Sequence, residues 1–337
     1  MPEPGKILSA KAGEALRWWA QPRLTIAFFI LAALAAVALT QTSLHPTLVM
    51  WVPFLLLVIN LVAAVLVTPR FRTDIPLLVF HLALLCLIFL FAIGRLTYLE
   101  GRALLTQDAA FSGIPDEVRH GPWHGDRIGR IRFANLGITE VYPKFNDFRH
   151  TYNTVMWWDA SGQPQVTEIG DDKPLIVEGF RIFASRNRGV SPILSWQPAD
   201  GGPPQRGSLQ LGQRFGDVFE NAVAWKLPDG QDAWLALEAR AEQPAAPAKE
   251  TVDMGVYELD HVLVLRIGAS RHLLRKGESI DLGAGRLTYE RLLTWMGYRI
   301  VYDPTIPWII GTIGVGIASL IWYYIRRVFA KPLELST

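Results

Sequence analysis

Cysteine is nearly absent from this chain, which has one, Cys86, among 337 residues. A single thiol supports neither an intramolecular dithiol cycle nor an internal disulfide, so any extracytoplasmic part must be held together by an ordinary core. CxxCH is missing as well, and the chain therefore carries no covalently attached c-type haem. CxxC, HExxH, GxSxG, GxGxxG and P-loop patterns are also missing. Hydrolase, nucleotidyl-transfer and dithiol chemistry have no supporting motif.

A marked excess of charge of either sign is missing too. The chain has 33 Lys and Arg against 31 Asp and Glu, for a net charge of +2. Proteins that bind nucleic acid usually show a strongly basic face or a known motif, and the sequence shows neither. We therefore expect no nucleic-acid partner.

Apolar residues, in contrast, make up 50% of the chain and concentrate in four runs. The runs are about Leu24–Leu39, Val49–Val67, Pro76–Ile93 and Pro307–Tyr324. Each approaches the ~20 residues that cross a lipid bilayer as a helix. The first run could be mistaken for part of a signal peptide, but no small-residue cleavage site follows it, so we expect a retained helix. The sequence predicts a membrane protein with four transmembrane α-helices.

Lysine and arginine mark alternate ends of these runs. They precede the first run, occur between the second and third as Arg70 and Arg72, and follow the fourth as Arg326 and Arg327. The loop at 41–48 has neither residue type. Because cytoplasmic loops carry the excess of basic residues, both termini are expected in the cytoplasm. The chain is then a multi-pass protein of the bacterial inner (cytoplasmic) membrane, with its largest segment in the periplasm.

These spans divide the chain into five expected parts, with three helices before the large segment and one after it. They are a cytoplasmic N-terminal segment at 1–23, three transmembrane helices at 24–94, a periplasmic β-rich domain at 95–306, a fourth transmembrane helix at 307–325 and a cytoplasmic tail at 326–337.

The large segment alternates apolar and polar residues, as in 175–183, 222–227 and 261–267, which is typical of half-buried strands. Turn signals with Gly and Pro separate these stretches, and helical periodicity is scarce. We predict an all-β, antiparallel domain built as a sandwich or a curled sheet. Pro-rich loops are expected to divide it into two lobes, about 120–196 and 207–300.

Two conspicuous groups in this segment have ordinary interpretations. Trp157-Trp158-Asp159 ends a predicted strand, and core packing followed by an Asx turn explains it. His120 and His124 flank a short loop, but two possible ligands with no nearby third are weak evidence for a metal site.

His81 is the exceptional residue, because it lies inside the third apolar run. At ~1.5 Å rise per residue it is about 7–8 Å into the bilayer from Pro76. An ionisable group at such depth usually meets a cavity, a partner or a ligand. Two interpretations are open: haem coordination, which an apolar wall around one imidazole would suit, or an interhelical hydrogen bond, for example to Asn60. The apolar residues on the same helical face are Leu77, Leu78, Leu84, Leu85 and Ile88.

Several segments resemble, in order, parts of one known family. They are His81–Leu85 in the third helix, Gly101–Asp108 after it, Asp172–Ser185 with its Pro-Leu pair, and Tyr302–Trp308 leading into a last helix that closes with Arg326-Arg327. With three helices, a large external β-rich domain and a final helix, this pattern resembles the ResB (CcsB) family of System II cytochrome c biogenesis proteins. The likeness extends over most of the chain.

The resemblance implies a subunit of a membrane complex that exports haem and presents it for covalent attachment to apocytochrome c. Its partner would be a CcsA-like membrane protein, which would supply the second haem ligand. His81 would be an axial ligand to the iron of a non-covalent haem b, and this chain would position haem as part of a cytochrome c synthase (haem lyase) without a catalytic residue of its own. The alternative is a ResB-like anchor or scaffold for a periplasmic redox complex, without synthase activity.

Overall fold

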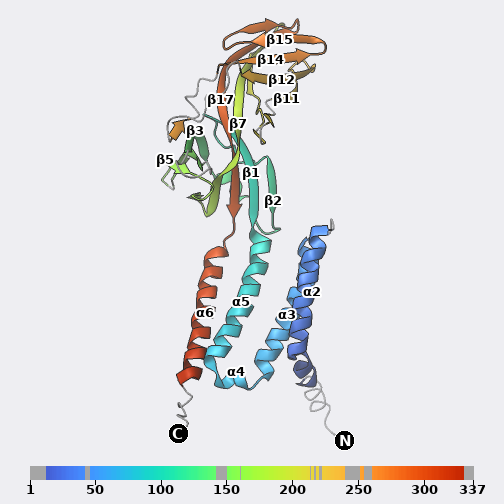
Figure 1. Ribbon diagram of the computed structural model, residues 1–337, viewed down its shortest axis with the longest axis vertical. Helices are drawn as coiled ribbons and strands as arrows, with labels where there is room; N and C mark the ends of the chain where they lie inside the picture. Colours follow the sequence, from blue (N-terminus) through green and yellow to red (C-terminus); the bar gives the residue numbers. More distant parts are fainter. Residues whose placement is uncertain are drawn as a thin grey trace. The chain divides into compact units, whose positions relative to one another are not determined.

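The computed structural model describes nine stretches of the chain: 13–41, 46–141, 150–159, 161–212, 214–215, 218–219, 222–239, 251–253 and 260–329. It divides into two compact units (Figure 1). The helical unit takes in Met1–Tyr98, Gly121–Trp123 and Asp303–Thr337, and the β unit takes in Leu99–His120 and His124–Tyr302. Most of the predicted cytoplasmic N-terminal segment and tail lie outside the described residues.

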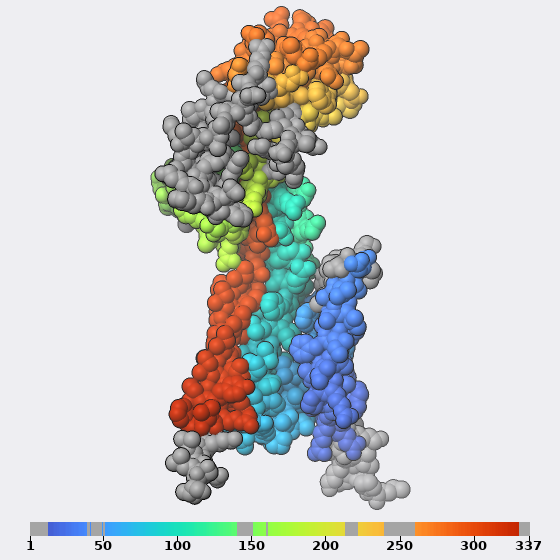
Figure 2. Space-filling view, viewed as in Figure 1, coloured from blue at the N-terminus to red at the C-terminus, as the bar shows by residue number. Residues whose placement is uncertain are grey.

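The helical unit holds the four apolar runs. Its helices are α2 Pro22–Gln41, α3 Pro46–Val67, the short α4 Arg70–Thr73, α5 Ile75–Thr97 and α6 Ile306–Phe329. Pro76 lies in the first turn of α5, where a proline costs no backbone hydrogen bond. Arg326 and Arg327 occupy the last turn of α6, where cations interact favourably with the helix dipole. Figure 2 shows α6 packed along α5.

Two of these helices, α5 and α6, are long and apolar enough to cross a membrane. The first apolar run reaches that standard only when Gly13–Trp19 and Pro22–Ala38, which meet at a bend of 51°, are counted as one span. In the second run, the part of α3 whose side chains are described without a gap, Trp51–Val67, is shorter than a full span. The structure therefore supports membrane association through two or three helices, and the count of four stays a prediction.

The β unit is antiparallel throughout its named pairings, as predicted. Its largest sheet has the order β2-β1-β17-β7-β6, with β16 beside β17 and β8 beside β7. Two four-stranded sheets follow the orders β13-β3-β4-β5 and β11-β12-β14-β15, and β9 pairs with β10. The strands are β1 Leu99–Thr106, β2 Glu117–His120, β3 Phe133–Val141, β4 His150–Trp158, β5 Pro164–Ile169, β6 Leu175–Val177, β7 Phe180–Pro198, β8 Gln205–Ser208, β9 Arg214–Phe215, β10 Val218–Phe219, β11 Ala222–Lys226, β12 Asp232–Ala239, β13 Thr251–Asp253, β14 His261–Ile267, β15 Ser270–Leu274, β16 Ser279–Asp281 and β17 Gly285–Tyr302.

Two long strands, β7 and β17, organise this unit. They pair over nearly their whole length, with irregularities between Tyr289 and Arg291 and between Met296 and Tyr298. One half of each strand contributes to a core with β1, β3 and β4, and the other half contributes to a second core with β12 and β14. The expectation of two lobes is therefore correct, but their division into 120–196 and 207–300 is wrong. Each of the two long strands belongs to both cores, because each is long enough to cross from one to the other.

The predicted strand at 175–183 is interrupted. Val177 pairs with Phe180, and the two residues between them, Glu178 and Gly179, have φ angles of 52° and 79°. Positive φ at both positions is the geometry of a tight type I′ hairpin turn. Buried apolar residues stand at 175 and 177 before the turn and at 180 and 182 after it, so the alternation shifts by one position at the turn. The sequence prediction joined the apolar residues on both sides into one strand.

Asp159 ends β4 in the Asx turn that the sequence predicted. Its Oδ1 atom accepts hydrogen bonds from the backbone nitrogens of Ser161 and Gln163 and from the Ser161 hydroxyl. These bonds stabilise the carboxylate, and the hydroxyl bond from Ser161 contributes most to holding the pKa of Asp159 below its ordinary value. Trp157 is partly buried against the first core, so the triplet has the structural role expected for it.

Candidate haem-ligand site

His81 is held in one orientation by its own helix. It is the seventh residue of α5, and its Nδ1 atom lies 2.8 Å from the carbonyl oxygen of Leu77, one turn earlier. A carbonyl only accepts hydrogen bonds, so Nδ1 carries the proton and donates it. In the neutral ring the lone pair is then on Nε2. Histidines that bind metals commonly have this arrangement, with one ring nitrogen bonded to a carbonyl and the other available to the metal.

The surroundings of His81 are aromatic and apolar. The ring of Phe71 in α4 meets the His81 ring edge-on, with centroids 4.6 Å apart, and the Phe80 ring lies 5.4 Å away. Phe71 is buried and His81 is half-buried. The five apolar residues predicted to share this face of α5 are all half-buried as well. One neutral imidazole nitrogen among such groups fits a single axial position on haem iron.

Asn60 is not the partner of His81, so the predicted interhelical hydrogen bond between these two residues is wrong. The Asn60 side chain is 3% exposed and faces the first apolar run. Its Oδ1 atom accepts a hydrogen bond from Thr25 at 2.6 Å, and its Nδ2 atom donates to the carbonyl oxygen of Trp19 at 2.5 Å. These contacts tie α3 to α2 through Thr25 and to the preceding helix, Gly13–Trp19, through Trp19. They satisfy a buried amide that would otherwise be costly in an apolar setting.

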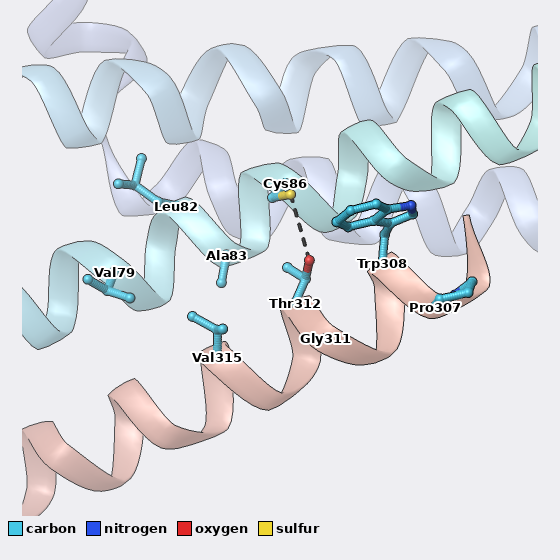
Figure 3. A pocket seen from close by; sticks show the side chains of 9 residues that line it. All are labelled: Val79, Leu82, Ala83, Cys86, Pro307, Trp308, Gly311, Thr312 and Val315. Carbon is cyan, nitrogen blue, oxygen red and sulfur yellow. Dashed lines mark hydrogen bonds between the residues drawn. The ribbon is translucent and has the colours of Figure 1, made fainter. Parts of the chain in front are cut away.

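A cavity of about 640 Å³ lies between α5 and α6 (Figure 3). The Sγ atom of Cys86 and the Oγ1 atom of Thr312 lie 3.7 Å apart at its wall. On α5 the lining residues Val79 and Ala83 stand two positions from His81, which is about 200° around a helix. The cavity therefore opens on the opposite face of α5 from the imidazole. Its lining consists of Val79, Leu82, Ala83, Cys86, Pro307, Trp308, Gly311, Thr312 and Val315.

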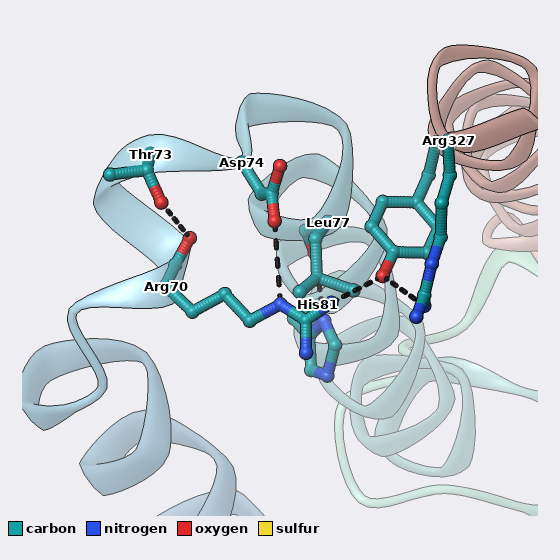
Figure 4. Close-up of polar contacts among 7 residues, drawn as sticks. Arg70, Thr73, Asp74, Leu77, His81 and Arg327 are labelled. Atoms are coloured by element: carbon teal, nitrogen blue, oxygen red, sulfur yellow. Dashed lines mark hydrogen bonds and ion pairs between the residues drawn. The ribbon is translucent and has the colours of Figure 1, made fainter. Parts of the chain in front are cut away.

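A polar cluster joins α4 to α6 at the end of α5 nearer His81 (Figure 4). Arg70 donates from Nη2 to the Tyr323 hydroxyl oxygen at 2.6 Å, and Arg327 donates from Nη1 to the same oxygen at 3.2 Å. Arg70 also donates from Nε to Asp74 at 3.3 Å. Sequence reasoning used these arginines only as markers of orientation. It missed their convergence, because 253 residues separate Arg70 from Tyr323 and no local pattern connects them.

His120 and His124 belong to the β unit, and their ring centroids lie 6.3 Å apart. His124 is 4% exposed and packs edge-on against Phe180 and Tyr302 in the first core. Within the described stretches no group of three or more His, Cys, Asp or Glu side chains is placed to hold a metal ion. A haem ligated by one imidazole does not depend on such a group.

Comparison with known proteins identifies no family for this chain. The sequence matches no protein-family model. No curated protein matches it either. Among solved structures, the chain is similar to "Cytochrome c Heme Lyase CcmF", with 10% sequence identity and a TM-score of 0.29, over 90% of this chain and 34% of that one. This chain thus spans about a third of the length of that structure. At this TM-score and identity the likeness carries no argument about this chain.

Proposed function

We propose that this protein is a ResB-like subunit of a membrane complex that binds haem b through His81 and presents it for covalent attachment to apocytochrome c. The observation that carries the proposal is the hydrogen bond from Nδ1 of His81 to the Leu77 carbonyl, which leaves Nε2 as a ligand within an apolar helix. The order of the helices and the β unit along the chain supports it. A CcsA-like membrane protein would contribute the second ligand.

Each element has a part in this proposal. Leu77 fixes the tautomer of His81, and Phe71 with the half-buried leucines of α5 excludes water from the imidazole. Haem iron, when bound, supplies the redox chemistry. The β unit would lie in the periplasm of the bacterial inner membrane and hold the apocytochrome or the partner subunit, with both termini in the cytoplasm. We assign no catalytic residue to this chain.

The test is the haem content of the purified full-length protein. His81→Gly is expected to lose at least about nine-tenths of the bound haem, because a metal ligand is removed without a substitute. Added imidazole should restore the haem absorbance, since it can occupy the space left by the side chain. His272→Ala, in strand β15 of the β unit, is the matched control and should retain haem. Haem absorbance that is the same in the His81→Gly variant and the control would refute the proposal.

A second function, a ResB-like anchor or scaffold without haem, is favoured by two observations. The cavity between α5 and α6 faces away from His81, and the aromatic neighbours of the imidazole come from the protein itself. In that case the native full-length protein, purified free of endogenous cytochromes, would show no haem absorbance. His81→Gly would then change only its stability.

A further inference from the structure

Arg70, Tyr323 and Arg327 bring an unusual set of donors to one point. Two guanidinium groups donate to a single neutral oxygen, at 2.6 and 3.2 Å. Arg70 also lies over the Tyr323 ring, with its central carbon 5.9 Å from the ring centroid. The three side chains come from α4 and from the last turns of α6, so the cluster exists only when these helices are packed together.

The charges of this cluster are not balanced. Asp74 pairs with Arg70 at 3.3 Å, and Tyr323 contributes no charge. Within the described part of the chain Arg327 has no ion pair. Two like charges held beside one oxygen repel each other, and an anion at this point would reduce that repulsion. The nearest basic residues along the chain, Arg72 and Arg326, add to the positive field.

The Tyr323 hydroxyl supplies a further donor. A phenolic oxygen that accepts hydrogen bonds from both arginines still has its own proton to donate. None of the described residues accepts that proton. The two arginines are exposed, and each retains N–H groups beyond those engaged in the cluster. Planar guanidinium groups suit the oxygens of carboxylates and phosphates, which can accept several such bonds at once.

The cluster is also close to His81 along the chain. Phe71, which packs on the His81 ring, directly follows Arg70. Asp74, which pairs with Arg70, precedes His81 by seven residues of helix, or about 10 Å at ~1.5 Å per residue. An amphiphile whose apolar body lies beside His81 would therefore have its head near Arg70.

We infer that Arg70, Tyr323 and Arg327 form a binding site for the oxyanion headgroup of a membrane-soluble amphiphile. The shared chemistry is a carboxylate or phosphate, and its source is a porphyrin propionate or a phospholipid. If the oxyanion is a porphyrin propionate, the inference rests on the proposed function, because the porphyrin ring must then lie beside His81. If the oxyanion is a phospholipid phosphate, the inference does not depend on the proposed function.

The experiment measures binding to the full-length protein in detergent, with four probes. Iron-free protoporphyrin IX offers carboxylates without a metal, and its dimethyl ester offers the same ring without charge. Short-chain phosphatidylglycerol offers a phosphate, and short-chain diacylglycerol offers the same chains without one. The double variant Arg70→Ala/Arg327→Ala is compared with Arg72→Ala/Arg326→Ala, which removes equal charge from the same two helices.

The double variant Arg70→Ala/Arg327→Ala is expected to bind protoporphyrin IX or phosphatidylglycerol at least about tenfold more weakly than the control variant Arg72→Ala/Arg326→Ala, because charge-assisted hydrogen bonds are lost. The neutral probes should bind all variants alike. Loss for the porphyrin identifies a propionate site, and loss for the lipid identifies a headgroup site. If Arg70→Ala/Arg327→Ala binds both anionic probes with affinities within about twofold of those of Arg72→Ala/Arg326→Ala, the inference is overturned.

Two further variants keep the test decisive. Arg70→Lys/Arg327→Lys preserves charge and helix packing but not the planar fork, so it should bind the anionic probe more weakly than the wild type. Wild-type affinity in this variant would contradict the assigned geometry. His81→Gly should lower haem retention far more than it lowers the affinity for iron-free protoporphyrin, because only haem offers the imidazole a metal. Failure of haem binding through His81 is thereby separated from failure of the oxyanion site.

Discussion

At the scale of single residues, the β unit depends on a fully buried polar network. The Tyr298 hydroxyl donates to Oδ1 of Asn153 at 2.6 Å, and Nδ2 of Asn153 donates to Oδ1 of Asn135 at 2.7 Å. Asn135 in turn donates to the carbonyl oxygen of Leu105 at 3.0 Å. The two asparagines and the tyrosine are all 1% exposed or less. The network therefore links β1, β3, β4 and β17 in the first core.

Asn153→Ala is expected to lower the free energy of unfolding by about 2–4 kcal/mol, because it leaves the buried Tyr298 hydroxyl without its acceptor and removes one of the two donors to Oδ1 of Asn135. Urea denaturation followed by tryptophan fluorescence measures the change. Asn187→Ala, at an exposed position on β7, is the matched control and should change stability by less than about 0.5 kcal/mol. Equal stability of the two variants would show that the network contributes nothing.

Tyr298 also makes stability depend on pH. Burial raises the pKa of its hydroxyl well above the ordinary value, despite the opposing hydrogen bond to Asn153. The folded state therefore keeps a proton that the unfolded chain releases near pH 10. Stability is fully present below that pH and falls as the pH rises above it. Between about pH 9 and 11.5, the free energy of unfolding should decline less steeply in Tyr298→Phe than in the wild type, and parallel declines would contradict this.

At the scale of elements, the pairing of β7 with β17 requires glycine at one crossing point. A Cβ atom on Gly189 would lie 2.5 Å from the carbonyl oxygen of Leu211 and 2.7 Å from Nε1 of Trp295. Those two groups are hydrogen-bonded to each other at 2.9 Å and are buried. A larger residue at 189 must therefore displace both the strand and the indole.

Gly189→Ala is expected to destabilise the protein by about 1–3 kcal/mol through overpacking. It should also alter the near-ultraviolet circular dichroism of the tryptophans. Gly207→Ala is the matched control, since a Cβ atom there meets nothing within 4 Å. If both variants unfold at the same denaturant concentration, the close approach at Gly189 has no energetic consequence.

At the scale of the whole molecule, the β unit should fold without the helices. Both hydrophobic cores lie within it, and they share β7 and β17. A fragment of residues 99–302 is therefore expected to unfold in one cooperative transition, because neither core can lose these strands without the other. Circular dichroism and tryptophan fluorescence should report the same midpoint. Two separated transitions would mean that the cores are independent domains.

Much of the fold could be predicted because its signals are local. The apolar run from Pro76 to Ile93 indicates a helix by itself, and α5 extends over it. The Asx turn of Asp159 depends on neighbours within four residues. The turn at Glu178 and Gly179 was missed because apolar residues stand close on both sides of it and were taken as one strand, although their alternation shifts by one position there. His81 was singled out by its depth in an apolar run, which is also a local property.

The sequence by itself determined the apolar helices, the antiparallel β character and the one imidazole within a helix, since hydropathy and side-chain period act over a few residues. Only the tertiary structure decided that β7 and β17 serve two cores, that Asn60 bonds to Thr25 and Trp19, and that Arg70 and Arg327 meet at Tyr323. These contacts join segments far apart in the chain. Their formation depends on the packing of whole elements, which no short pattern encodes.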